Sequence, residues 1–244
     1  MAKQALITGG TKGIGRAIAV CLAKAGYDLL LTYNTDETTA ANLAAALRKD
    51  HAVKVDMLQA DITQKESIDR IENRLNDSGV KLDALVLNAG TTYRTTFEEM
   101  NLAEWERQFF ANVHFPVFLL QRIVGRMEHG AAVVFTGSLM GIEPHATSLS
   151  YGVTKSAVHA LTRNLVKFLD NSQCGEGLAQ TNAVRKDAAV VFFQLIDNGQ
   201  HGVPLKIVER APDFTLLKAR GLVGKHILGY VIQKLAEDMV QRHA

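Results

Sequence analysis

Five short apolar runs rich in β-branched residues recur between residues 4 and 136, and this recurrence limits the possible folds most strongly. Such runs are typical of buried parallel strands. Segments with helical periodicity separate them, so strand and helix alternate along the chain. This alternation predicts an α/β fold built on a doubly wound parallel sheet. The predicted strands are Gln4–Thr8, Asp28–Tyr33, Val53–Gln59, Leu82–Asn88 and Ala131–Thr136.

The segments between these runs place apolar residues at helical spacing. Ile14, Ile18, Cys21 and Leu22 follow an i, i+4, i+7, i+8 pattern, which puts them on one face of a helix. With helices on both faces of the sheet, residues 1–244 are expected to form a single Rossmann-type domain. The other predicted helices cover Thr38–Arg48, Ile68–Leu75, Leu102–Met127 and Tyr151–Leu169.

Composition excludes several classes of protein. Of the 244 residues, 47% are hydrophobic and 21% are charged, as in an ordinary soluble globular protein. The formal net charge of +2 is too small to favour nucleic acid or an anionic membrane as a partner. Cys21 and Cys174 match neither a disulfide framework nor a metal-binding pattern, and neither a signal peptide nor a membrane-spanning segment is expected. A cytoplasmic protein without a metal is expected.

A glycine-rich loop connects the first predicted strand to the first predicted helix. Glycines in such a loop let the backbone turn tightly and approach a pyrophosphate, whose charge the helix N-terminus favours. The alternative is a turn that only packs the strand against the helix. The order of strand, loop and helix favours the binding function. The candidate cofactor-binding residues of this loop are Gly9, Thr11, Lys12, Gly13, Ile14 and Gly15.

Two further candidate cofactor-binding segments follow predicted strands. Asp61 and Ile62 come after the third strand, where a carboxylate can accept a hydrogen bond from an adenine amino group. Capping of the next helix by Asp61 explains the same residue equally well. Asn88-Ala89-Gly90 closes the fourth strand, at the edge where such sheets bind ligands. An ordinary turn is the alternative for this tripeptide.

Tyr151 and Lys155 carry the strongest chemical signal. Their i, i+4 spacing on a predicted helix lets both side chains enter one cleft, and Ser138 ends the fifth strand nearby. A free tyrosine has a pKa of about 10, and a neighbouring cation favours the phenolate. The pair can therefore donate and accept a proton near neutral pH.

Together these motifs make residues 1–170 resemble the short-chain dehydrogenase/reductase family, and within it the 3-oxoacyl-carrier-protein reductases. The resemblance implies that Tyr151 exchanges a proton with the reacting oxygen and that Ser138 hydrogen-bonds this oxygen. It implies that Lys155 lowers the pKa of Tyr151 and holds the nicotinamide ribose, and that Asn112 supports a proton-relay water. It further implies a ketone or acyl-thioester substrate, and a homo-oligomer formed through helices 102–127 and 151–169.

The charge of the residues at the end of the second predicted strand affects which of NADP(H) and NAD(H) the protein prefers. An acid there would bind a ribose 2′-hydroxyl and repel a 2′-phosphate, but Asn34 is neutral. Lys12 stands where members of the family that prefer NADP often carry a basic residue, whereas Asp36 lies slightly beyond the usual acidic position. NADP(H) is therefore favoured over NAD(H).

The last third, residues 171–244, departs from the family pattern. The family's proline-glycine loop and its final Asp-Gly-Gly are missing, and two apolar runs, Ala188–Ile196 and Leu205–Val208, predict a hairpin before a helix over Leu222–Arg242. Two hypotheses remain open. One is an NADP-dependent ketone reductase with a divergent C-terminal portion, and the other is a non-catalytic dinucleotide-binding protein that cannot close over a substrate.

Overall fold

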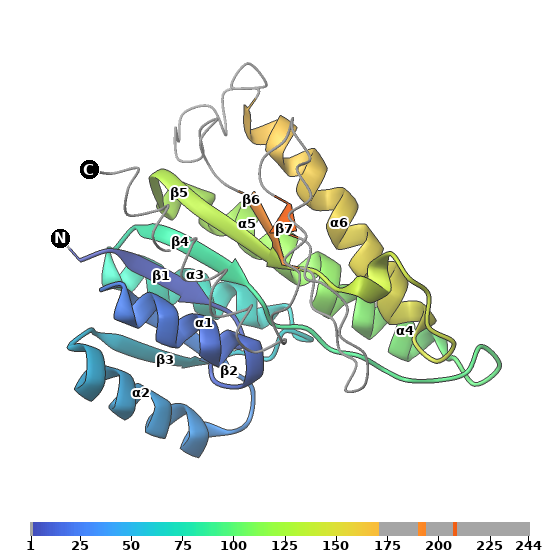
Figure 1. Ribbon diagram of the computed structural model, residues 1–244, viewed down its shortest axis with the longest axis horizontal. Helices are drawn as coiled ribbons and strands as arrows, with labels where there is room; N and C mark the ends of the chain where they lie inside the picture. The colour runs from blue at the N-terminus through green and yellow to red at the C-terminus, as the bar shows by residue number, and fades with distance from the viewer. Residues whose placement is uncertain (1, 171–189, 194–206, 209–244) are drawn as a thin grey trace, which may run out of the picture.

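The structure, a computed structural model, describes residues 2–170, 190–193 and 207–208. Its central element is a seven-stranded sheet. Its strand order is β3-β2-β1-β4-β5-β6-β7, and every neighbouring pair is parallel except β6 with β7. The predicted doubly wound parallel sheet is confirmed (Figure 1). The strands are β1 Gln4–Ile7, β2 Asp28–Tyr33, β3 Val55–Gln59, β4 Leu82–Leu87, β5 Met127–Thr136, β6 Val190–Phe193 and β7 Ile207–Val208.

Helices cover both faces of this sheet, as predicted (Figure 1). Successive strand residues point to opposite faces, so Ile7 packs in the cluster with α1 and α2 while Leu6 packs in the cluster with α3, α5 and α6. Both residues are fully buried. The helices are α1 Gly13–Lys24, α2 Glu37–His51, α3 Glu66–Ser78, α4 Leu102–Phe109, α5 Phe115–Ile123 and α6 Leu149–Asp170.

The predicted continuous helix over 102–127 is wrong in two respects. A π-helical turn, Phe110–His114, separates α4 from α5, and the Phe115 N–H donates to the carbonyl of Phe110. Pro116 explains the break, because proline has no N–H to donate to the carbonyl four residues earlier. The helix also ends early, since a short 3₁₀ turn over Val124–Arg126 leads into β5, which begins at Met127 rather than Ala131.

The predicted C-terminal hairpin is confirmed where the structure describes it. β6 lies parallel to β5 and antiparallel to β7, with Phe192 opposite Val208 and Phe193 opposite Ile207. The predicted turn and the helix expected over Leu222–Arg242 lie outside the described residues. A single domain spanning residues 1–244 stays a prediction.

Candidate active site

A pocket of about 720 Å³ lies at the carboxyl ends of the parallel strands. This is the edge at which doubly wound sheets bind ligands, and the volume suits a small-molecule or cofactor site. It contains most of the predicted site residues and extends from the end of β2 to α6. The predicted residues that line it are Gly9, Ile14, Asn34, Asp61, Ile62, Asn88, Ala89, Gly90, Ser138, Tyr151 and Lys155.

The glycine-rich loop forms one end of the pocket. Gly9 has a φ of +63°, a conformation that side chains rarely adopt. A Cβ on Gly15 would lie 2.1 Å from the carbonyl oxygen of Gly9, so only glycine lets α1 approach the loop this closely. Thr11, Lys12, Gly13 and Gly15 are not among the lining residues, and Gly15 therefore acts through packing.

Asn88 joins this loop to two strands. Its Nδ2 donates to the carbonyl oxygens of Thr8 at 3.2 Å and Gly9 at 3.3 Å, and its Oδ1 accepts from the Thr136 hydroxyl at 3.3 Å. The Thr8 hydroxyl accepts in turn from the N–H groups of Asn88 and Ala89. These contacts hold the ends of β1, β4 and β5 together, so this tripeptide is more than an ordinary turn.

An ion pair lies beside the end of β2. Lys12 Nζ is 2.5 Å from Asp36 Oδ2, and Asp36 also accepts from the Thr39 N–H as the N-cap of α2. The lysine, together with the Thr39 hydrogen bonds, lowers the pKa of Asp36 to about 2. The two residues that sequence reasoning weighed separately for cofactor preference are thus partners.

Asp61 lies at the pocket as predicted, but it does not cap α3. It lines the pocket, and its Oδ1 accepts from the N–H and the hydroxyl of Thr63, both at 2.9 Å. The helix cap itself is elsewhere, because α3 begins only at Glu66 and has Lys65 at its N-cap. Asp61 therefore caps the turn that precedes α3.

Lys155 is the most deeply buried charged group of the pocket. Its ammonium donates to the main-chain oxygen of Thr136 at 2.8 Å and lies 5.6 Å from the centre of the Tyr151 ring. Burial lowers the pKa of Lys155 to about 8, which leaves it mostly protonated at neutral pH. Ser138 is also buried, at the end of β5, and Tyr151 is half-buried. The predicted trio therefore meets in one pocket.

Asn112 does not line the pocket, and protein groups occupy its side chain. It accepts from the Thr91 N–H at 2.8 Å and donates to the Thr91 carbonyl at 2.9 Å and the Thr154 hydroxyl at 3.0 Å. The amide thus connects the segment after β4 to α6. Its π-helical position could not be read from helical periodicity.

Comparison with known proteins shows to which family this chain belongs. The model of the family described as short chain dehydrogenase matches residues 3–174, which is more than two thirds of the chain. The chain belongs to the short chain dehydrogenase family. An uncharacterized oxidoreductase, YmfI of Bacillus subtilis, is 32% identical to this family member over 171 residues, 69% of each chain. The short-chain dehydrogenase/reductase FrzI of Cladobotryum sp is 30% identical over 66% of this chain and 62% of its own length.

Solved structures resemble this fold. A short chain dehydrogenase from Burkholderia cenocepacia in complex with NADP has a TM-score of 0.65 and 27% identity, over 68% of each chain. The blue fluorescent protein from a metagenomic library, in complex with NADPH, has a TM-score of 0.64 and 29% identity over 68% of each chain.

The residues of this pocket fit a nicotinamide dinucleotide. Within the part of the chain that the structure describes, Lys155 Nζ donates one hydrogen bond, to Thr136, although an ammonium carries three N–H groups. The remaining donors are buried beside the pocket, where a bound hydroxyl group would satisfy them. Gly9 and Gly90 provide lining without side chains, so a ligand can approach the backbone closely.

Several residues that line the pocket were not predicted from the sequence. They come from the segment after β4 and from the segment between β5 and α6, which carry no motif that singles them out. Only their position after predicted strands could have indicated them. They include Thr91, Thr92, Arg94, Glu143, His145 and Ser148.

Two kinds of feature are absent from the described ranges, 2–170, 190–193 and 207–208. They contain no cluster of three or more histidine, cysteine or acidic residues placed to hold a metal ion. No helix in them is long and apolar enough to cross a membrane.

Proposed function

We propose that this oxidoreductase uses NADP(H) to reduce a ketone, a 3-oxoacyl thioester or a similar compound, to a secondary alcohol. The observation that carries the proposal is the convergence of Ser138, Tyr151 and the buried Lys155 ammonium in one pocket of about 720 Å³. Bound NADPH would supply the hydride that adds to the carbonyl carbon.

Each side chain has a chemical role in this proposal. The Tyr151 hydroxyl gives its proton to the carbonyl oxygen as negative charge develops there. Ser138 donates a hydrogen bond to the same oxygen and lowers the energy of the transition state. Lys155 stays protonated beside Tyr151, favours its phenolate after proton transfer, and binds the nicotinamide ribose. Asn112 supports the water through which Tyr151 regains a proton only indirectly in this proposal, because its side chain is bonded to Thr91 and Thr154 and fixes the structure beside Tyr151.

Measuring the reduction of candidate ketones with NADPH tests this proposed function. The absorbance of NADPH is followed with a panel of 3-oxoacyl thioesters and small ketones, after NADPH and NADH binding have been measured by thermal shift. We expect NADPH to raise the melting temperature and at least one ketone to be reduced. Binding of neither dinucleotide would contradict the proposal at its first step.

We propose that the protein prefers NADP(H) over NAD(H). Lys12, which pairs with Asp36, lies near the end of β2, where the neutral Asn34 does not repel a 2′-phosphate. Asp36→Asn keeps a capping side chain for α2 and frees the lysine for a 2′-phosphate. We expect NADPH affinity to rise up to about fivefold in this variant, the size of an exposed ion pair, and Lys12→Met to lower it similarly. NADH affinity should not change in either variant, and titrations of both cofactors check this. Stronger binding of NADH than of NADPH by the wild type would contradict the proposed preference.

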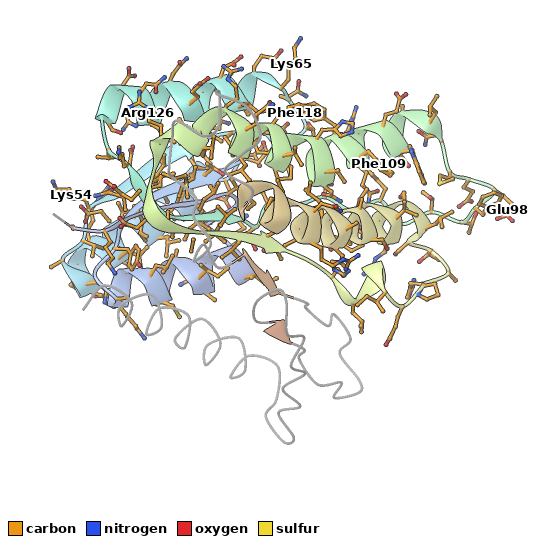
Figure 2. All side chains as sticks on the ribbon, turned by 90° about the horizontal axis from the view of Figure 1, so that it is seen from above. Lys54, Lys65, Glu98, Phe109, Phe118 and Arg126 are labelled. Atoms are coloured by element: carbon orange, nitrogen blue, oxygen red, sulfur yellow. The ribbon has the colours of Figure 1, made fainter. Side chains whose placement is uncertain are left out.

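Homo-oligomer formation is proposed through residues 102–127, which contain α4 and α5, and through residues 151–169 of α6. Phe118 on α5 is 49% exposed and Val153 on α6 is 38% exposed, so each helix presents apolar area to a second copy (Figure 2 labels Phe118). Light scattering should give a dimer or tetramer for the wild type and a smaller species for Phe118→Glu. A monomeric wild type would contradict this assembly.

A further inference from the structure

Gln108 is a polar side chain buried where packing alone would favour an apolar one. It lies on α4, is 0% exposed, and is the buried residue of that helix. Burying an amide costs free energy unless hydrogen bonds replace those lost to water. A glutamine at this position therefore points to a role for its polar atoms.

The Gln108 side chain joins two walls of the pocket through one oxygen. Its Oε1 accepts from the Ser150 hydroxyl at 2.9 Å and from the Tyr93 N–H at 3.3 Å. Ser150 precedes Tyr151 on α6, and Tyr93 belongs to residues 91–94, of which Thr91 and Arg94 line the pocket. Among the described residues, Nε2 has no hydrogen-bond partner, so the oxygen makes the polar contacts of this side chain.

Asn112 makes a second connection of the same kind one turn further along. It bonds Thr91 through both backbone groups and Thr154 through its hydroxyl. The two amides therefore hold residues 91–93 against α6 at Ser150 and at Thr154, on either side of Tyr151 in the sequence. The helices α4 and α6 are in contact, which brings these groups within reach of one another (Figure 1).

We propose that Gln108 is a positioning residue that sets where residues 91–94 lie relative to Tyr151 across the pocket. The inference rests on the proposed function, in which Tyr151 protonates the substrate. Small displacements of a substrate from its reacting group can cost about a hundredfold in rate. Loss of the Gln108 oxygen removes the bond that holds Tyr93, so residues 92–94 can shift while Asn112 still holds Thr91, and turnover falls without removal of any group that reacts.

Gln108→Met tests the proposal, because methionine keeps the length and volume but has no strong acceptor. We expect kcat to fall about tenfold or more, NADPH affinity to stay within about twofold, and hydrogen exchange in peptides covering residues 91–94 to accelerate. Ser150→Ala, which leaves the Tyr93 bond intact, should lower kcat less, and the double variant should match Gln108→Met. Asn73→Met, at an exposed position of α3 outside the proposed oligomer helices, is the control and should behave as the wild type.

The outcomes separate this inference from the proposed function. An active wild type with unchanged kcat and unchanged exchange in Gln108→Met overturns the positioning role and leaves the function intact. A lower melting temperature with unchanged kcat shows a merely structural glutamine and also overturns it. If the wild type reduces no ketone, the function fails and the positioning of a catalytic tyrosine fails with it, although the exchange data still show whether Gln108 holds residues 91–94.

Discussion

A Tyr151→Phe variant is expected to reduce ketones about 10²- to 10⁴-fold more slowly than the wild type, with NADPH affinity within about twofold. The factor is the usual contribution of a positioned proton donor, and phenylalanine keeps the ring that lies against Lys155. Steady-state rates of NADPH oxidation and a separate NADPH titration check the two parts of this expectation.

Tyr27→Phe provides a matched control for the loss of a tyrosine hydroxyl. Tyr27 is buried immediately before β2, at the opposite edge of the sheet from the pocket, so its variant should keep wild-type turnover. Wild-type turnover in Tyr151→Phe would contradict the assignment of the proton donor. NADPH binding without turnover of any ketone by the wild type would instead support the non-catalytic dinucleotide-binding protein.

A Lys155→Met variant is expected to change both activity and the pH dependence of stability. Burial lowers the pKa of Lys155 to about 8, whereas the unfolded chain keeps the proton up to about pH 10.5. Between these two values the unfolded state binds more protons, so the free energy of unfolding rises with pH. The shift corresponds to about 3 kcal/mol, and this cost of the buried charge is fully present below pH 8.

Urea unfolding of the free protein between about pH 7 and pH 10.5 measures this dependence. The wild type should gain stability with pH across the window, and Lys155→Met should lose that gain. Lys49→Met, at an exposed position of α2, should keep it. Ketone reduction by Lys155→Met should fall at least about tenfold, because the cation beside Tyr151 is gone. An identical rise in stability in wild type and Lys155→Met would show that Lys155 is not the group responsible.

Local patterns were sufficient to predict most of the fold. The β2 strand was predicted with its observed ends, and β1, β3 and β4 with ends within two residues, because buried parallel strands read as continuous apolar runs. The helical spacing of Tyr151 and Lys155 likewise predicted that both side chains reach one pocket, as they do. The break at Phe110–His114 was missed because it depends on one missing N–H, that of Pro116, rather than on periodicity.

The sequence by itself determined the alternation of strands and helices, the glycine-rich loop and the residue types of the candidate site. Only the tertiary structure decided which of these residues touch. The Thr136 oxygen that holds Lys155, the pair of Lys12 with Asp36 and the bond from Ser150 to Gln108 join residues 19, 24 and 42 positions apart. Such contacts depend on sheet order and helix packing, whereas periodicity reports only which face of its own element a residue occupies.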